Sequence, residues 1–282
     1  MADVHELSTT VPSRRPSRAD IVLPEALADL GPTAAAARSC PEARISRASV
    51  LSADCELASA VPAIDRPRAQ RVTWSTTITF PAGPIELARV PHAPATFALL
   101  VIRGVLTRET MLSDRAMIEL LLAGDVLSPW PPAAAGLLTE TGLTALSDVR
   151  LAVLDHRFLK AAAVWPQLMI AIQRRIGDQQ HRLAIHGAIC QLPRVEQRVL
   201  AVLWLLAART GVVTAGGTEL HLTLTHDSLA QLTGSRRPTV SLAVKHLRDH
   251  GHLDRRDSGE WLLPSAPTRL AFEDLAANLA EV

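Results

Sequence analysis

The chain of 282 residues is long enough for about two domains, each with a core of its own. Hydrophobic residues make up 48% of it, as in ordinary globular proteins, whereas aromatic residues make up only 3%. The formal net charge is +1. This near-neutral balance excludes a chain that attracts nucleic acid through its overall charge, so any such site needs a local cluster of basic residues.

The cysteines and the N-terminus indicate the cellular compartment in which the protein is expected. Cys40, Cys55 and Cys190 are far apart and form no CxxC pair. They predict free thiols in a reducing compartment, with no disulfide framework and no cysteine metal or iron–sulfur site. Residues 1–20 lack the apolar core of a secretory signal, and no apolar stretch reaches the roughly 18 residues of a membrane span. We therefore expect a cytoplasmic protein with no metal, no cofactor and no membrane partner.

Residues 1–70 are rich in Ala, Pro, Ser and Arg and show no sustained hydrophobic period. Prolines recur along this stretch and would interrupt most helices. Such a composition predicts a mostly disordered N-terminal extension, with at most a short helix near residues 23–30.

Residues 71–155 contain short runs of the kind that form β-strands. These runs are residues 72–80, 97–102, 105–111, 117–122 and 149–154. Glycine-containing turns separate several of them, for example at Gly104 and at Gly124-Asp125. Many short strands with close turns predict a small barrel or roll.

Residues 156–192 change to helical spacing. Proline is tolerated in the first turn of a helix, so Trp165-Pro166 marks the expected start, and Leu192-Pro193 marks the end. One face carries an apolar stripe, formed by Leu168, Ile172, Ile176, Leu183 and Gly187. A long helix with such a stripe needs a partner, which is either a second copy of the same helix or the chain's own β-domain. Both can hold, and the first predicts a dimerisation helix.

Residues 193–282 are expected to form a C-terminal unit. An apolar helix over residues 195–208 is followed by a turn and a short strand at residues 221–224. Nearer the end of the chain, residues 253–256 and 260–263 flank a polar turn. Two strands joined in this way predict a β-hairpin, the wing of a winged helix.

Two helices are predicted between that strand and the wing. Thr225 can cap a short helix, which Thr233-Gly234 breaks. Ser235 can cap a second helix over residues 236–250. Helix, glycine-containing turn and helix together follow the plan of a helix-turn-helix.

The second of these helices has one buried and one polar face. Its buried stripe consists of Val240, Ala243, Val244 and Leu247. An α-helix fits the major groove of DNA, where arginine reaches guanine edges and lysine meets phosphate. The candidate DNA-binding residues on this helix, at its start and in the wing are Ser235, Arg236, Arg237, Thr239, Ser241, Lys245, Arg248 and Arg256. Each alone is equally well explained as a solvated surface residue, but their combination predicts DNA binding.

Four segments resemble one known family. Residues 234–241, followed by a helix that ends at Gly251, resemble the helix-turn-helix of the Crp/Fnr superfamily of transcription regulators. Upstream segments resemble, in the same order, that family's cyclic-nucleotide-binding β-roll; they are residues 101–104, 122–127 and 143–155. The resemblance covers about residues 72–264. It implies an α+β fold with a β-roll, or jelly roll, then a long dimerisation helix and a C-terminal winged helix-turn-helix. It also implies a homodimer on two-fold double-stranded DNA, with RNA polymerase as a further candidate partner.

The sequence departs from the members that bind cyclic AMP. Those members hold the cyclic phosphate with a glycine-glutamate pair and a later arginine, whereas here Gly124-Asp125 stands at the pair and residues 126–148 contain no Arg or Lys. Pro238 and Leu242 stand where those members place a glutamate and an arginine for base reading, so a different operator is expected. The candidates for an effector pocket are Gly124, Asp125, Leu137 and Thr139. The apolar segment over residues 129–138 favours an unknown uncharged or apolar ligand, and a roll that acts without any effector is the alternative.

Two other classes of protein compete with the DNA-binding interpretation. An enzyme is disfavoured, because the chain has no GxGxxG, GxxxxGK[ST], GxSxG or HExxH motif. The second class is a ligand- or protein-binding module that uses the winged helix for protein docking. Salt-sensitive, sequence-selective affinity for DNA distinguishes the two, since phosphate contacts release counterions.

Overall fold

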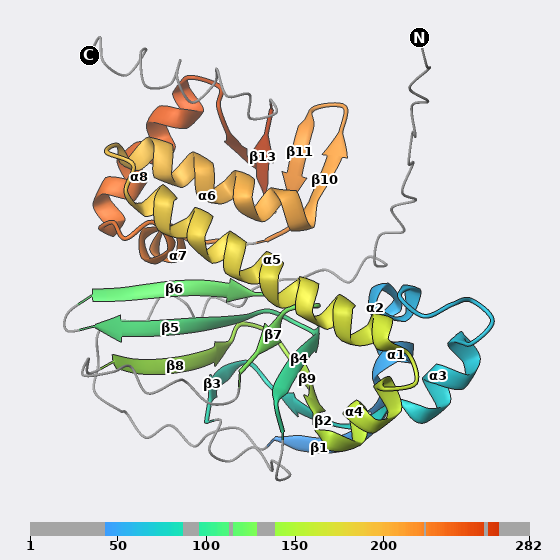
Figure 1. The fold of residues 1–282 in the computed structure, drawn as a ribbon. Coiled ribbons are helices and arrows are strands. Elements are labelled where there is room, and N and C mark those ends of the chain that lie inside the picture. The colour runs from blue at the N-terminus through green and yellow to red at the C-terminus, as the bar shows by residue number, and fades with distance from the viewer. Residues whose placement is uncertain are drawn as a thin grey trace, which may run out of the picture.

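The computed structural model describes residues 43–86, 96–112, 115–128, 139–222, 224–256 and 259–264. Figure 1 shows a β-roll, a long helix that crosses over it, and a helical C-terminal unit on the other side of that helix. The helix expected near residues 23–30, and the effector candidate Leu137, lie outside the described residues.

The β-roll consists of two antiparallel sheets that share one apolar core. The five-stranded sheet has the order β1-β2-β9-β4-β7, with bounds Arg44–Ser49, Trp74–Phe80, Val149–Leu154, Ala98–Arg103 and Val126–Leu127. The four-stranded sheet has the order β3-β8-β5-β6, with bounds Gly83–Ile85, Thr139–Ala145, Leu106–Leu112 and Arg115–Leu121. Alternate residues such as Val149, Leu151 and Val153 point into the core, as the period of a β-strand requires. All five predicted runs contain a strand, so the prediction of a roll is confirmed.

Residues 44–70 are folded, so the expectation of a mostly disordered extension is wrong for this part of the chain. The strand β1 pairs along its whole length with β2, and three helices follow it: α1 Val50–Ala53, α2 Cys55–Ser59 and α3 Arg66–Val72. The proline-rich composition wrongly indicated disorder, because these prolines do not interrupt a helix: Pro62 precedes α3, and Pro67 lies in its first turn. The helices gain stability from burying Val50, Leu51 and Leu57 against the rest of the chain.

The long helix α5, Pro166–Cys190, begins with Trp165 as its N-cap, as predicted. A shorter helix, α4 His156–Ala162, precedes it. Leu168 and Ile172 are buried among α1, α2, α4 and the roll, so this half of the predicted stripe packs on the chain's own β-domain. A different face of α5 is exposed and carries Ile170, Gly177, Ala184 and Ala188. Among the described helices, none is both long and apolar enough to cross a membrane.

The C-terminal unit combines three helices with a four-stranded sheet of order β10-β11-β13-β12. The helices are α6 Val195–Thr210, α7 His226–Leu232 and α8 Arg237–Asp249. The strands are β10 Gly211–Thr214, β11 Gly217–Leu220, β12 Asp254–Arg255 and β13 Trp261–Leu263. The strand expected at residues 221–224 is misplaced, because the tight turn at Gly217 (φ +129°) closes a hairpin that ends at Leu220. The predicted pairing of the two wing strands is confirmed.

Asp54 should be a strong stability determinant of the folded N-terminal segment. Its carboxylate caps α2 by accepting a hydrogen bond from the Leu57 N–H (2.9 Å), and it also accepts one from Arg175 Nη2 of α5 (2.9 Å). Asp54→Ala should lower the free energy of unfolding by about 2–3 kcal/mol, since it removes a helix cap and leaves a mostly buried guanidinium with only the exposed Glu56 as a partner. Urea unfolding followed by circular dichroism measures this loss.

The matched control is Glu56→Ala. Glu56 also faces Arg175, but its side chain is 85% exposed, so its ion pair should contribute less than about 0.5 kcal/mol. Equal effects of the two substitutions would contradict the assignment to Asp54.

Candidate nucleic-acid interface

The first helix of the predicted pair, α7, begins and ends as the sequence indicates. Thr225 Oγ1 accepts a hydrogen bond from the Ser228 N–H (3.1 Å), which satisfies one free donor of the first turn. After Leu232 the chain turns at Gly234, whose φ is +59°. Glycine adopts this conformation without strain, so it allows the close turn between the two helices.

The second helix, α8, begins one residue later than the cap at Ser235 requires. Arg236 is the N-cap and makes no side-chain capping bond, and Pro238 lies in the first turn. Ser235 Oγ instead donates a hydrogen bond to the Thr233 carbonyl (3.2 Å). The prediction that Ser235 caps α8 is therefore wrong, although Ser235 remains beside the start of the helix.

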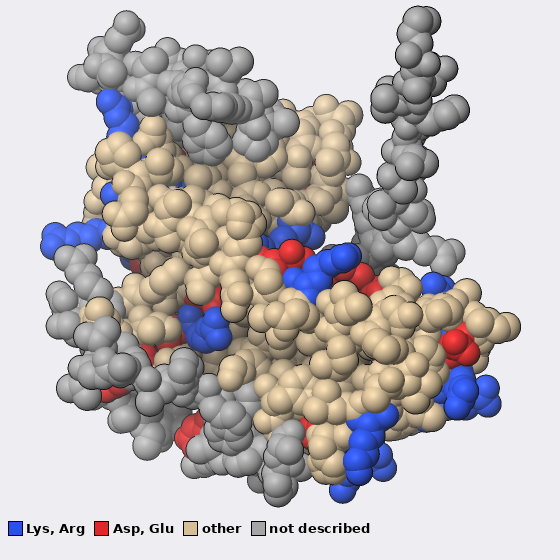
Figure 2. Space-filling model, viewed as in Figure 1, with Lys and Arg blue, Asp and Glu red and all other residues tan. Residues whose placement is uncertain are grey.

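The helix α8 separates into the two faces that the sequence predicts. Its buried stripe packs on α6, α7 and the sheet, and consists of Val240, Ala243, Val244 and Leu247. Five of the candidate DNA-binding residues are exposed on α8 or at its N-cap: Arg236, Arg237, Thr239, Lys245 and Arg248. Ser241 is half-buried, and Arg256 is exposed in the wing. Figure 2 shows lysine and arginine side chains at the edge of the C-terminal unit where Figure 1 places α7 and α8.

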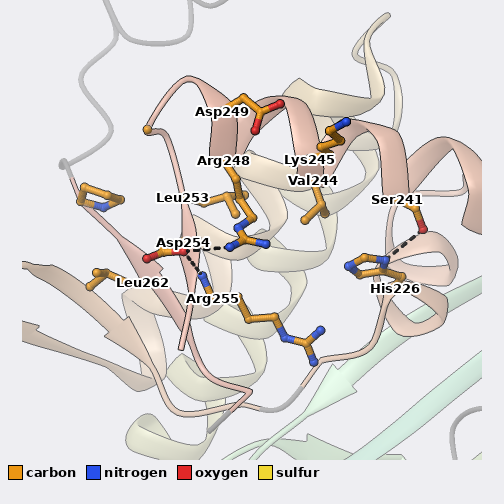
Figure 3. A pocket seen from close by; sticks show the side chains of 12 residues that line it. His226, Ser241, Val244, Lys245, Arg248, Asp249, Leu253, Asp254, Arg255 and Leu262 are labelled. Carbon is orange, nitrogen blue, oxygen red and sulfur yellow. Dashed lines mark hydrogen bonds and ion pairs between the residues drawn. The ribbon is translucent and has the colours of Figure 1, made fainter. Parts of the chain in front are cut away.

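A groove lies between α8 and the wing and is lined by residues of both elements (Figure 3). Lys245 and Arg248 line it from α8, and Arg255 lines it from the wing. Arg255 lies over the Trp261 ring, with 5.3 Å from its guanidinium carbon to the ring centroid. Its Nε is buried without a hydrogen-bond partner among the described atoms. Arg255 is not among the residues predicted from the sequence, although its neighbour Arg256 is; alternation along a strand indicates that the two point to opposite faces.

Three of the candidate arginines already have acidic neighbours. Arg237 lies 3.3 Å from Asp227. In the wing region, Arg248 lies 3.5 Å from Asp254, and Arg256 lies 2.6 Å from Glu219. For Lys245, no ion pair is found within the described ranges. These exposed pairs are weak, so a phosphate can compete for the guanidinium groups.

His226 links α7 to α8. Its Nδ1 lies 2.9 Å from Ser241 Oγ. Burial lowers the pKa of His226, and the positive charges of Arg255 and Arg237 lower it further. The imidazole is therefore neutral at neutral pH and holds Ser241 through an uncharged hydrogen bond.

The stability of the folded chain should depend on the protonation of His226. Because its pKa is lowered in the folded state, the unfolded chain takes up the proton more readily, and the free energy of unfolding should fall as the pH drops below 6.5. His226→Asn keeps a hydrogen-bonding group but does not titrate, so it should lose less stability than the wild type between about pH 7.5 and pH 5.5. Urea unfolding at both pH values measures the difference, with the exposed His181→Gln as the control. Identical pH dependence in wild type and His226→Asn would contradict this role.

Of the three effector candidates that the structure describes, Gly124 and Asp125 lie at the junction between the roll and the C-terminal unit, whereas Thr139 does not. Gly124 occupies a turn with φ +93°, and Asp125 follows it with a side chain only 3% exposed. Thr139 begins β8 and pairs with Leu112 of β5, away from that turn in the sheet order. The four candidates remain a prediction.

The buried carboxylate of Asp125 contacts three parts of the chain. It accepts a hydrogen bond from the Leu122 N–H (2.9 Å) of its own turn, one from Arg182 Nη2 of α5 (2.6 Å), and two from the Arg209 guanidinium of α6 (2.9 Å each). Burial lowers the pKa of Arg182, and the charge of Arg209 lowers it further. We call Asp125, Arg182 and Arg209 the Asp125 cluster. Its carboxylate is committed to the junction rather than to a cavity inside the roll.

Apolar contacts continue this junction. Ile118 and Leu120 of β6 belong to the same buried cluster as Leu229 and Leu232 of α7. The imidazole of His186 on α5 also contacts α7, with Nε2 2.6 Å from the Leu232 carbonyl oxygen. The helix-turn-helix is thus docked on the roll through α7, which leaves α8 facing outward (Figure 1).

Asp125→Asn should loosen this docking. The substitution removes the charge that compensates two largely buried guanidinium groups, and it should cost about 2 kcal/mol of stability. Hydrogen exchange should accelerate in β6 and α7 more than in the remaining strands of the roll. Asp148→Asn, at an exposed position of the roll, serves as the control and should leave exchange unchanged. Unaltered protection of α7 in Asp125→Asn would show that the apolar contacts alone hold the junction.

Comparison with known proteins agrees with this architecture. Residues 197–268 match the Crp-like helix-turn-helix domain. The chain has a Crp/Fnr-type fold. Together these findings support a DNA-binding transcription regulator.

Three solved structures illustrate the likeness. A cyclic nucleotide-binding domain containing protein from Listeria monocytogenes is 17% identical, with a TM-score of 0.57 over 75% of this chain and 97% of the other. A CooA mutant from Carboxydothermus hydrogenoformans is 18% identical, with a TM-score of 0.56 over 71% and 87%. FixK2 from Bradyrhizobium japonicum is 20% identical, with a TM-score of 0.52 over 71% and 96%. No curated protein sequence matches the chain.

Proposed function

We propose that this protein is a sequence-specific transcription regulator that binds a two-fold DNA operator as a homodimer. The observation that carries the proposal is the outward face of α8, where exposed cationic side chains stand beside a wing at a shared groove. A helix with a cationic outer face can enter the major groove, while cations at its edges and in the wing meet the phosphates on either side.

The described geometry suggests separate roles for the cations. Arg237 lies in the first turn of α8, the part of a recognition helix that reaches base edges, so it is the candidate for reading guanine. Lys245 lies two turns further on and makes no ion pair within the described ranges, so it suits a phosphate. Arg255 lines the groove, and its Nε has no hydrogen-bond partner among the described atoms, so it is a further candidate for a phosphate contact.

The exposed face of α5 is the proposed contact between two copies. The first half of the predicted apolar stripe packs on the chain's own roll, as the burial of Leu168 and Ile172 shows. On the exposed face, Gly177, Ala184 and Ala188 are small enough for two helices to approach closely, and Ile170 is 61% exposed next to them. Pairing there would bring two C-terminal units to one side of a duplex, with half-sites about 34 Å apart.

The side chains inside the roll indicate which class of effector it can bind. The described cluster between its two sheets consists of apolar side chains such as Ile78, Leu99 and Val101. Among the described residues, this cluster supplies no cationic group to compensate the charge of a cyclic phosphate. We propose that the roll takes an uncharged or apolar ligand, or acts without a ligand as a scaffold for the dimer.

Selection of DNA from a random duplex pool tests the proposal. The wild-type chain should enrich a two-fold motif, and its affinity should fall steeply between about 50 and 200 mM salt. Lys245→Ala should weaken binding evenly across sequences and reduce the salt slope by about one. Arg237→Ala should lose the preference at one position of each half-site, by about 1–3 kcal/mol. Arg68→Ala, exposed on α3 of the N-terminal segment, is the matched control and should bind as the wild type does.

Failure to enrich any duplex at either salt concentration would contradict the proposal as stated. The same selection with a cell metabolite extract then separates two explanations. Enrichment restored by the extract indicates a required effector, whereas its continued absence favours a winged helix that docks a protein.

A further inference from the structure

The centre of the outward face of α8 is apolar in its first half. Leu242 is 69% exposed, although it lies on a helix whose other leucine, Leu247, is buried. Pro238 lies one turn before Leu242, and Thr239 lies three residues before it, and both are exposed. These three residues form the apolar strip of α8, which lies opposite the buried stripe.

The polar side chains border this strip rather than occupy it. Arg237, at the start of α8, leans toward Asp227 of α7. Ser241 is held by His226, and Arg248 by Asp254 of the wing. These three partners all lie on the side of α8 that faces α7 and the wing.

An exposed leucine by itself indicates nothing, because single apolar residues are common on protein surfaces. The position of Leu242 in the first half of α8 gives its exposure a meaning. The first turns of a recognition helix approach the base edges most closely. In the major groove, the apolar group at a base edge is the C5-methyl of thymine, and apolar side chains are its natural contacts.

We propose that Leu242, supported by Pro238 and Thr239, selects a thymine in each half-site of the operator by packing on its methyl group. The inference rests on the proposed function and names the base chemistry that the strip reads. Burying one methyl contributes roughly a fourfold difference in affinity. The preference is therefore a packing preference, and it should be insensitive to salt, unlike the contacts of Lys245.

Replacing thymine by deoxyuridine tests this directly, since the two bases differ only by that methyl group. The probe is the duplex enriched by the full-length chain, with each thymine of one half-site replaced in turn. For the wild type, one replacement should weaken binding roughly fourfold, at low and moderate salt alike. For Leu242→Ala, the same replacement should have no effect, and for Leu242→Met, which keeps an apolar side chain of similar size, the sensitivity should return. Val213→Ala, a change at an equally exposed apolar residue on β10, should retain the wild-type response.

The outcomes separate this inference from the function on which it rests. An enriched motif whose half-sites contain no thymine, or deoxyuridine replacements without effect in the wild type, would overturn the role of Leu242 and leave the regulator intact. Equal sensitivity in wild type and Leu242→Ala would assign the methyl contact to another residue and would also overturn the inference. Absence of any enriched duplex, with or without the metabolite extract, would overturn both.

Discussion

A single buried carboxylate joins the parts of this protein. Asp125 lies in a turn of the roll, yet its oxygens accept hydrogen bonds from Arg182 of α5 and Arg209 of α6. A charge so little exposed to water is tolerated only when opposite charges and N–H donors surround it, so the three elements must meet in one geometry. That geometry sets where α6 leaves α5, and hence where the recognition helix stands relative to the exposed face of α5.

The same junction is the route by which the roll can influence DNA binding. A change in the roll can reach the reading helix by altering the Asp125 cluster or the apolar contact between β6 and α7. In a dimer paired through α5, a small rotation of each C-terminal unit about this junction would change the separation of the two α8 helices. An effector would then act by favouring one separation, and a roll without effector would hold one separation permanently.

The DNA-reading surface, by contrast, is built locally. Thr225 caps α7, and Gly234 allows the turn. Val240, Val244 and Leu247 of α8 fill a core shared with α6 and Trp261. Because the buried stripe alone packs on this core, the opposite face of α8 is exposed. It carries cations at its edge and an apolar strip at its centre. The proposed reading chemistry thus combines guanine contacts from Arg237 with thymine contacts from Leu242.

Local patterns in the sequence determined the helix-turn-helix, the wing, the start of α5 and the main strands of the roll, because caps, glycine turns and periods of two or 3.6 residues act over short distances. They failed for residues 44–70, whose helices form only when β1 pairs with β2 and Leu57 is buried under α5. They also placed Asp125 in an effector pocket, and could not reveal that Arg182 and Arg209, 57 and 84 residues later, compensate its charge. Which face of α5 is buried was likewise decided by tertiary packing, since a stripe specifies that a helix needs a partner but not which surface supplies it.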